Sequence, residues 1–326
     1  MKKILLFSLL ITISFISQGQ EVDSLDFKIG QMIIVGISGT EVSQNQKLIE
    51  DITKGQVGGI ILYEKNIAPK NSYIRLKNLT WSLKEKAPVP LFVAIDQEGG
   101  KVNRLKQKYG FPKSVTAEYL GKTGSLDSTY FYSEITAATL AGLGINVNFA
   151  PVLDLSTFKQ NPVIAKSGRA FSDHPDSVAA HAEQVVKAHR KFNIITSLKH
   201  FPGHGSSHDD THLGIADVTD YWQSMELTPY HSLMENNKVD AIMTAHIVNK
   251  RLDSAGLPGT LSKAIMTDLL RDSLNYKGVI FSDDMQMHAI TKHFGLEKAL
   301  RLSILAGVDI LMFSNNIQGV SSILCQ

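Results

Sequence analysis

The segment from residue 199 to residue 212 has a high density of side chains that can exchange protons. Its fourteen residues include four histidines and two adjacent aspartates: His200, His204, His208, His212, Asp209 and Asp210. On a helix the histidines would share one face and could hold a metal ion, but Pro202, Gly203 and Gly205 disfavour a helix. We therefore expect a polar loop after a buried strand at 194–198, where imidazoles and carboxylates are placed to move protons.

Other polar residues follow apolar runs elsewhere in the chain. They are 63–66 after 59–62, Asp96 after 91–95, Asp154 after 145–149, His246 after 241–244, Asp283 and Asp284 after 279–281, and 314–316 after 309–313. Lys199 and Arg169 add cations to this set. The chain has no Gly-x-Ser-x-Gly elbow, which disfavours a serine hydrolase. A carboxylate facing a proton donor across a glycosidic bond suits these groups, and a His/Asp metal hydrolase is the alternative.

The elements that must position these groups follow a regular rhythm. Eight apolar runs indicate strands at 32–35, 59–62, 91–95, 145–149, 194–198, 241–244, 279–281 and 309–313. Helical patterns lie between them at about 43–53, 71–86, 127–142, 175–191, 222–236, 261–273 and 287–306. Continuous apolar strands alternating with helices predict a parallel sheet covered on both faces. Eight such units favour a (β/α)8 TIM-type barrel, with the polar groups converging at the C-terminal ends of its strands.

Composition limits the classes of protein that the chain can represent. The 326 residues are 43% hydrophobic, and the formal charge is 33 − 31 = +2, without a basic run that would indicate nucleic-acid binding. The single cysteine, Cys325, excludes a disulfide within the chain and a cysteine-based zinc cluster. No Gly-x-Gly-x-x-Gly follows the first strand and no Walker motif occurs, which counts against dinucleotide and P-loop folds.

The N-terminus has the pattern of a secretory signal peptide. Lys2 and Lys3 precede an apolar stretch at 4–16, and small residues then lead to a cleavage position after Gly19. A membrane anchor is the alternative, although the apolar stretch is short for a full span. We therefore predict a signal peptide over residues 1–19, a single barrel domain over residues 20–326, and an exported protein that is periplasmic or extracellular.

Three long motifs resemble those of the bacterial β-N-acetylhexosaminidases of glycoside hydrolase family 3. The first is Lys-His-Phe-Pro-Gly-His-Gly at 199–205, followed by Asp-Thr-His at 210–212. The second spans 94–105, and the third, Gly-Val-Ile-Phe-Ser-Asp-Asp-Met, spans 278–285. Shorter matches lie at 148–154, 169–171 and 243–246, so that the resemblance runs from about residue 28 to residue 316.

The resemblance implies a retaining exo-β-N-acetylhexosaminidase that removes terminal β-linked N-acetylglucosamine. Asp283 would be the nucleophile that forms a covalent glycosyl-enzyme, and His212 would be the general acid/base with Asp210 as its partner. An imidazole suits this role because its unperturbed pKa of about 6.5 lies near working pH, and a neighbouring carboxylate stabilises the imidazolium. The spacing to His212 favours Asp210 over Asp209 as that partner.

The resemblance also implies which residues hold the hydroxyl groups of the sugar: Asp96, Arg169, Lys199 and His200. The two cations would donate to hydroxyl oxygens, whereas Asp96 would accept from hydroxyl hydrogens. Arg104 is included among the binding residues, although bracing the loop suits it better. Asp154 and His246 match less certain positions and can equally be structural. His208 matches no family position, and we interpret it as a solvated loop residue.

Several alternatives stay open at the level of sequence. A β-glucosidase or β-xylosidase of the same family is one, although the Pro-Gly-His-Gly and Asp-Thr-His strings favour N-acetylhexosamine. An inactive exported sugar-binding protein is a second, and the joint presence of Asp283, Asp210 and His212 argues against it. A metal-dependent hydrolase that uses the His-rich loop is a third. Phosphorolysis in place of hydrolysis is a fourth, because a histidine acid/base does not repel phosphate as a carboxylate would.

We expect no cofactor and no metal. The expected substrate is an N-acetylglucosamine-containing oligosaccharide or muropeptide, from peptidoglycan recycling or from chitin, and the expected protein is a monomer without a nucleic-acid partner or a stable membrane span. Only a dozen residues, 315–326, follow the last predicted strand. An eighth barrel helix is therefore expected to be short or incomplete.

Overall fold

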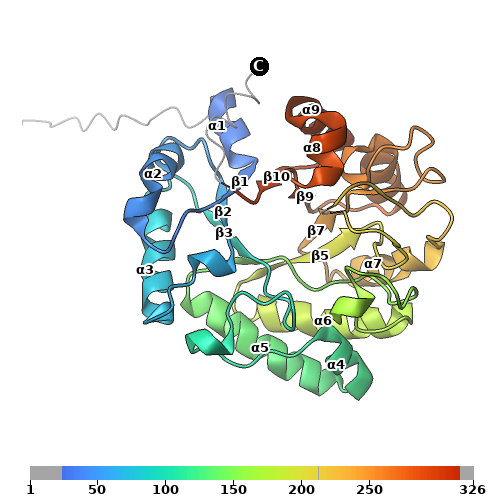
Figure 1. The fold of residues 1–326 in the computed structure, drawn as a ribbon, viewed down its shortest axis with the longest axis horizontal. Coiled ribbons are helices and arrows are strands. Elements are labelled where there is room, and N and C mark those ends of the chain that lie inside the picture. The colour runs from blue at the N-terminus through green and yellow to red at the C-terminus, as the bar shows by residue number, and fades with distance from the viewer. Residues whose placement is uncertain (1–23, 212, 316–326) are drawn as a thin grey trace, which may run out of the picture.

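The computed structural model describes residues 24–211 and 213–315. Its centre is a closed barrel of parallel strands in the order β1-β10-β9-β7-β5-β4-β3-β2 (Figure 1). The strands are β1 (Ile33–Gly36), β2 (Gly59–Leu62), β3 (Phe92–Ile95), β4 (Val147–Asn148), β5 (Ile195–Phe201), β7 (Ala241–Thr244), β9 (Val279–Asp284) and β10 (Ile310–Phe313). The predicted (β/α)8 barrel is confirmed. The predicted signal peptide, residues 1–19, and any helix after residue 315 lie outside the described residues.

Each barrel strand is buried on both faces because its side chains alternate between two apolar layers. In β1, Ile33 and Val35 pack outward in the same cluster as Leu48 and Ile52 of helix α2 (Gln46–Thr53), whereas Ile34 points into the barrel. The interior cluster contains Ile34, Ile61, Ala94, Val147, Phe149, Ala241, Met243, Phe281, Ile310 and Met312. The barrel is therefore a packed core rather than a pore, and its rigidity supports the groups at the strand ends.

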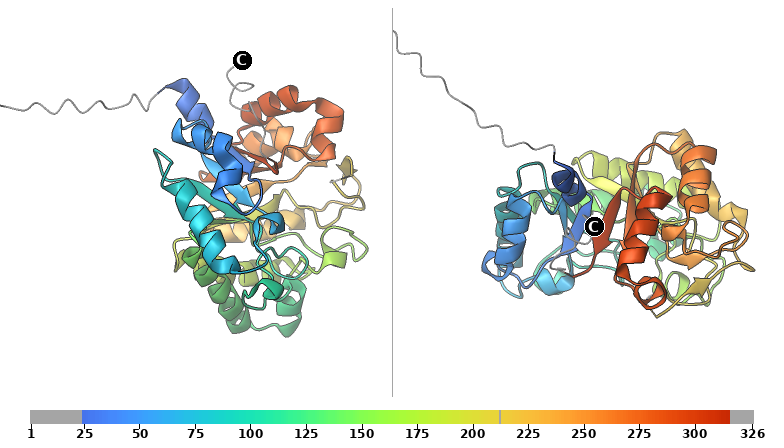
Figure 2. Two further views of the ribbon diagram at one scale, coloured as in Figure 1. Left: turned by 60° about the vertical axis from the view of Figure 1, so that its left-hand side comes forward. Right: turned by 90° about the horizontal axis from the view of Figure 1, so that it is seen from above.

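Helices form the outer wall of the barrel (Figure 2). They are α1 (Leu25–Gln31), α2 (Gln46–Thr53), α3 (Ser72–Lys84), α4 (Ala117–Thr123), α5 (Leu126–Gly142), α6 (Pro175–Arg190), α7 (Thr228–Glu235), η7 (Ala264–Ser273), α8 (His288–Phe294) and α9 (Leu296–Ala306). In α6, Pro175 occupies the first turn, and Val178, Ala182, Val185 and Val186 are buried at helical spacing. An amphipathic stripe of this kind holds a helix against the strands.

Short helical turns occupy several of the connections. They are η1 (Val42–Asn45), η2 (Glu64–Asn66), η3 (Gln107–Tyr109), η4 (Ala165–Ser167), η5 (Ser224–Leu227) and η6 (Gly259–Leu261). Of the described helices, none combines the length and the apolar character that crossing a bilayer requires.

The structure differs from the sequence-based expectations in four places. Helices α1 and α4, each seven residues long, were not predicted. The predicted helix at 287–306 is divided into α8 and α9 at Gly295, whose φ of +71° interrupts the helical backbone. A small parallel pair, β6 (Ala216–Asp217) and β8 (Ile247–Val248), lies outside the barrel order and packs in its own cluster with Trp222.

The barrel register is irregular where two of its strands carry polar side chains. The pairing of β5 with β7 shifts between Leu198 and Phe201, and the pairing of β10 with β9 shifts between Ile310 and Met312. An irregularity of register changes the direction in which the adjacent side chains point. The first shift brackets Lys199 and His200, and the second lies opposite the end of β9 at 281–284.

Candidate active site

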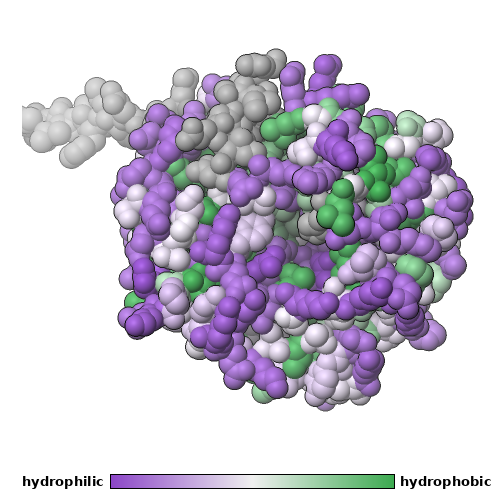
Figure 3. Space-filling model, viewed as in Figure 1, coloured by the Kyte–Doolittle hydropathy of each residue, from purple (hydrophilic) through white to green (hydrophobic). Residues whose placement is uncertain are grey.

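Polar residues from distant parts of the sequence meet at the C-terminal ends of the strands. Asp96 follows β3, Lys199 and His200 lie within β5, and Asp283 lies within β9. The face of the molecule seen in Figure 1 is hollowed near its middle, with hydrophilic residues around the hollow (Figure 3). The convergence expected of a (β/α)8 barrel is therefore present.

Lys199 is the centre of a buried ion-pair network. Its Nζ atom lies 2.7 Å from Oδ1 of Asp96 and 2.7 Å from Oε1 of Glu98, and its side chain is only 2% exposed. Burial alone would lower the pKa of Lys199, but the charges of Asp96 and Glu98 outweigh burial and raise it. Lys199 is therefore a permanent cation that, from β5, fixes two carboxylates of the segment that follows β3.

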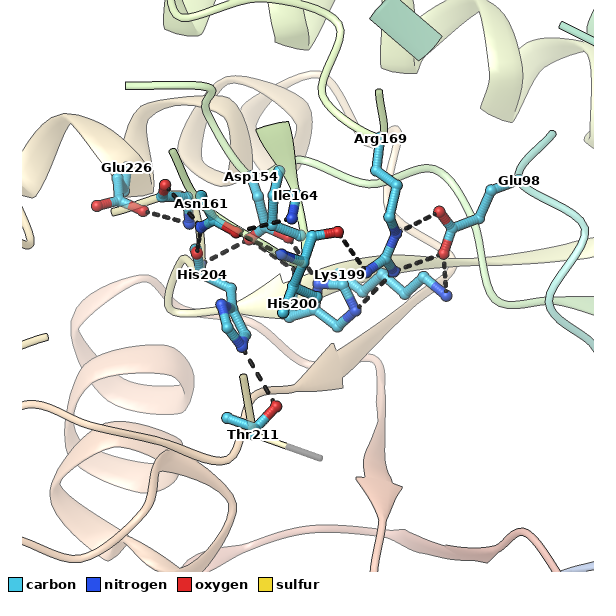
Figure 4. A network of polar contacts seen from close by, with 12 residues as sticks. Glu98, Asp154, Asn161, Ile164, Arg169, Lys199, His200, His204, Thr211 and Glu226 are labelled. Atoms are coloured by element: carbon cyan, nitrogen blue, oxygen red, sulfur yellow. Dashed lines mark hydrogen bonds and ion pairs between the residues drawn. The ribbon is translucent and has the colours of Figure 1, made fainter. Parts of the chain in front are cut away.

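Arg169 completes the pairing of Glu98. Its Nε and Nη2 atoms donate to Oε2 and Oε1 of Glu98 at 2.8 and 2.7 Å, in a bidentate arrangement (Figure 4). Burial would raise the pKa of Glu98, but the charges of Arg169 and Lys199 hold it well below its usual range. A bidentate guanidinium–carboxylate pair also restricts orientation, so Glu98 holds both cations at the rim.

His200 joins this network to Asp154. Its Nδ1 atom lies 2.6 Å from Oδ2 of Asp154, and its Nε2 atom lies 3.2 Å from Nη2 of Arg169. Because a guanidinium has only donors, Nε2 of His200 accepts and Nδ1 carries the proton that is donated to Asp154. Burial opposes the ionisation of Asp154, but its interaction with His200 prevails and lowers its pKa. Asp154 is therefore an ionised positioning residue beneath His200.

Arg104 contacts the network from the side of β2 and β3. Its Nη2 atom lies 3.3 Å from Oδ2 of Asp96, and its guanidinium lies 5.4 Å from the ring centroid of Tyr63. Burial, and next the charges of Asp96, Asp284 and Asp283, raise the pKa of the Tyr63 hydroxyl. Tyr63 thus stays protonated, and its hydroxyl donates to the sulfur of Met312 at 3.9 Å.

The loop after β5 is held at its start by three polar side chains. Oδ1 of Asp154 accepts from the backbone N–H of His204 at 2.7 Å. The side-chain amide of Asn161 donates to the carbonyls of His204 and Gly205 at 2.8 and 2.9 Å. Glu226 accepts from the N–H of Gly205 at 3.1 Å (Figure 4). A side chain at Gly205 would collide with the carbonyl of Leu155, with only 2.0 Å between that oxygen and a Cβ, so the close approach requires glycine.

The second half of this loop carries the proposed acid/base pair. Asp210 is half-buried and its carbonyl accepts from the N–H of Leu213 at 2.9 Å, whereas Asp209 is exposed. Thr211 is buried, and its hydroxyl lies 3.3 Å from Nε2 of His204. His212, the predicted proton donor, lies outside the described residues. The structure therefore places Asp210 on the loop without testing its pairing with His212.

Asp283 and Asp284 are adjacent, but their side chains have different hydrogen-bond partners. Oδ1 of Asp284 accepts from the N–H groups of Gln286 and Ser314, both at 3.0 Å, and burial raises the pKa of Asp284. The N–H of Asp283 donates to Oγ1 of Thr244 at 3.2 Å, and Oδ1 of Asp283 accepts from the N–H of Asp284 at 2.7 Å. Asp284 therefore ties β9 to the segment after β10, and Asp283 is the carboxylate placed at the rim.

His246 is a fully buried residue that supports β9. Its Nε2 atom lies 3.0 Å from the carbonyl of Asp284, and its Nδ1 atom lies 2.8 Å from Oγ1 of Thr260. A carbonyl only accepts, so Nε2 carries the proton and Nδ1 accepts from the threonine hydroxyl. The sequence left His246 as either a site residue or a structural residue, and these contacts favour a structural role.

Sequence reasoning missed three residues of the site and the ring contacts of a fourth. Glu98 was noted only as part of the motif at 94–105, yet it follows Asp96 at the two-residue spacing that puts side chains on one side of an extended chain. Asn161 and Glu226 act on loop backbone from distant segments, and no local pattern indicates them. His208 is exposed, as expected, but its ring is stacked between those of Phe158 and Tyr221.

No group of three or more histidine, cysteine, aspartate or glutamate side chains within the described residues is arranged to hold a metal ion. His200 and His204 each have a neighbouring carboxylate or hydroxyl as partner. Burial lowers the pKa of His204 to about 4. His204 is therefore neutral at physiological pH.

Together the fold and the site define a (β/α)8 barrel with carboxylates, cations and imidazoles at the C-terminal rim. A model of the glycosyl hydrolase family 3 N-terminal domain matches residues 24–324. The chain therefore belongs to glycosyl hydrolase family 3. It is similar to beta-hexosaminidase A of Pseudoalteromonas piscicida, with 36% identity over 82% of this chain and 47% of that protein. It is also similar to a beta-hexosaminidase of Xylella fastidiosa (strain M23), with 32% identity over 86% of this chain and 82% of that protein.

A similar solved structure is that of a glycoside hydrolase family 3 beta-N-acetylglucosaminidase from Paenibacillus sp. str. FPU-7. It superposes with a TM-score of 0.84 at 33% identity and covers 90% of this chain and 55% of that one. The chain thus spans about half the length of the Pseudoalteromonas and Paenibacillus proteins. The shared region is the barrel with its rim.

Proposed function

We propose that the protein is a retaining exo-β-N-acetylhexosaminidase that removes terminal β-linked N-acetylglucosamine. The observation that carries the proposal is the joint placement of Asp283 and the Lys199 network at one end of the barrel. A relative that matches 86% of this chain over 82% of its own length bears the name beta-hexosaminidase, which supports this substrate class. The competing glucosidase and xylosidase interpretations have no specific observation in their favour.

The sugar-binding step uses the ion-pair network. Asp96 accepts from sugar hydroxyl hydrogens, and Lys199 and Arg169 donate to hydroxyl oxygens. Because Glu98 already pairs with both cations, their positions are set before the sugar arrives. Little ordering entropy is then lost on binding, which is the advantage of a preorganised site.

In the reaction, a carboxylate oxygen of Asp283 attacks the anomeric carbon of the bound sugar. The carbon–oxygen bond to the leaving group breaks as the carbon–carboxylate bond forms, and His212 gives its proton to the departing oxygen. Asp210 stabilises the imidazolium before this transfer. In the second step water attacks the same carbon, its proton passes to His212, and Asp283 is released as a carboxylate.

The proposal is tested by assaying an aryl β-N-acetylglucosaminide beside the matching aryl β-glucoside and following the product anomers by NMR. We expect a strong preference for the N-acetyl substrate and β-N-acetylglucosamine as the first product. Preference for the glucoside would overturn the substrate assignment, and α-anomer as the first product would overturn Asp283 as nucleophile. A parallel reaction with inorganic phosphate distinguishes hydrolysis from phosphorolysis, because only phosphorolysis gives a sugar phosphate.

A further inference from the structure

Three rings from three separate loops form a continuous stack at the rim. The ring of His208 lies 3.8 Å from that of Phe158 at an interplanar angle of 10°, and 3.9 Å from that of Tyr221 at 16°. Phe158 follows β4, His208 belongs to the loop after β5, and Tyr221 follows β6. His208 is thus enclosed on both faces although its side chain is exposed to solvent at the edges.

The two outer rings stand on segments that are fixed by other contacts. Phe158 accepts a backbone hydrogen bond from Asn161, at 2.9 Å, and the side chain of Asn161 holds the start of the loop. Tyr221 precedes Trp222, whose indole N–H donates to the carbonyl of Pro202 at 3.1 Å. Phe158 and Tyr221 therefore have fixed positions, and the ring of His208 is held between theirs.

His208 is two residues before Asp210. Asp209, the residue between them, is exposed, and the hydroxyl of the buried Ser207 bonds to the N–H and the carbonyl of Asp209 at 3.3 and 2.8 Å. Apart from the stack itself, the two exposed residues, His208 and Asp209, have little apolar burial to order them. Stacking of the His208 ring between two aromatic rings buries apolar surface, and hydrogen bonds to water cannot substitute for that contact. The stack is therefore placed where the loop needs an additional anchor.

We propose that Phe158, His208 and Tyr221 form an aromatic clamp that positions Asp210, the carboxylate that assists proton donation in the candidate active site. The inference rests on the proposed function. His208 is then a positioning residue, acting through the loop and not on the sugar. Loss of the clamp is expected to impair the step that needs a well-placed proton donor and to leave sugar binding at the Lys199 network intact.

The test compares His208→Ala with His208→Phe, which removes the imidazole and keeps a ring for stacking. Two substrates separate the steps: di-N-acetylchitobiose, whose leaving group needs a proton, and an aryl β-N-acetylglucosaminide with an activated leaving group. For His208→Ala we expect kcat on the disaccharide to fall about tenfold, with a much smaller fall on the aryl substrate and little change in KM. His208→Phe is expected to retain most of the wild-type rate on both.

The rate of amide hydrogen exchange in peptides of the loop measures how well the clamp orders the loop, independently of catalysis. Exchange over 206–211 is expected to rise in His208→Ala and Tyr221→Ala and to return toward wild type in His208→Phe. His231→Ala, an exposed histidine on α7, is the matched control and should change neither rates nor exchange. Three results would each overturn the clamp. The first is wild-type rates and wild-type exchange in His208→Ala, and the second is an equal loss of rate on both substrates. The third is a His208→Phe variant that is as impaired as His208→Ala. An inactive wild type would instead overturn the proposed function while the exchange data still test the clamp.

Discussion

The proposed binding side of the site and its proposed reaction side are held by different kinds of contact. The binding side consists of Asp96, Glu98, Arg169, Lys199 and His200, and its charges are paired with each other inside the barrel rim. The reaction side consists of Asp210 and Asp283, which are placed by backbone hydrogen bonds and loop packing. The binding side is therefore part of the stability of the barrel, whereas the reaction side depends on the barrel without supporting it.

The largest expected difference between the effect on catalysis and the effect on stability is at Asp283. Asp283→Asn removes the nucleophile and keeps the side-chain oxygen that accepts from the N–H of Asp284. We expect kcat to fall by about 10⁴-fold or more, with a change of no more than about 1 kcal/mol in the free energy of unfolding. Steady-state kinetics and urea unfolding measure the two effects. A large loss of stability with modest loss of kcat would place Asp283 with the structural carboxylates.

On the binding side, Glu98→Gln should affect stability and catalysis together. The substitution leaves Lys199 and Arg169 buried with one negative charge fewer, and loss of one partner in a buried ion pair typically costs about 3–5 kcal/mol. Denaturant unfolding should show this loss, and KM should rise because the cations lose their fixed positions. Glu118→Gln is the control: its pair with Lys122 is exposed and is worth about 0.5 kcal/mol or less. Equal stability of the two variants would contradict the comparison.

Glu226 supports the loop between the two sides, and its contribution to the free energy of unfolding is expected to depend on pH. Burial, and next the charge of Asp154, raise the pKa of Glu226 to about 7. The folded state therefore holds a proton that the unfolded chain releases near pH 4.5, so this contribution to stability is complete below pH 4.5 and is lost as pH rises through about 7. It amounts to at most about 3 kcal/mol.

In Glu226→Gln the contribution is absent at every pH. The difference in unfolding free energy between wild type and variant should thus decline between pH 4.5 and pH 7 and stay level above that range. Burial also lowers the pKa of His189 and of His204 to about 4. These histidines make both proteins more stable as pH rises from about 4 to 6.5, so their effect cancels in the difference. A difference that does not depend on pH would show that Glu226 is ionised in the folded protein.

The barrel could be predicted from sequence because its signal is local and repeated. Each strand is a run of buried apolar residues, such as Gly59–Leu62, and the eight runs recur with helical patterns between them. Helix α4 and the β6–β8 pair were missed because seven residues, or two, carry too little periodicity to stand out. Their stability comes from tertiary contacts such as those of Trp222.

The site was predictable in part for the same reason. Asp96, Lys199 and Asp283 stand at strand ends, where fold geometry alone brings them together. Asn161 and Glu226 were not predictable, because they bind loop backbone that is distant in sequence. The stack at His208 joins three loops, and its partners become evident only when the loops are placed in space.

The charges around Lys199 balance. Three carboxylates, Asp96, Glu98 and Asp154, belong to the same network as three cations, Arg104, Arg169 and Lys199, and His200 joins Asp154 to Arg169. An uncharged sugar experiences little long-range electrostatic attraction, so its encounter with this network is governed by diffusion and shape rather than by electrostatic steering. Capture of a neutral glycan should then be nearly independent of ionic strength, and the enzyme would work equally well in dilute and in salty surroundings.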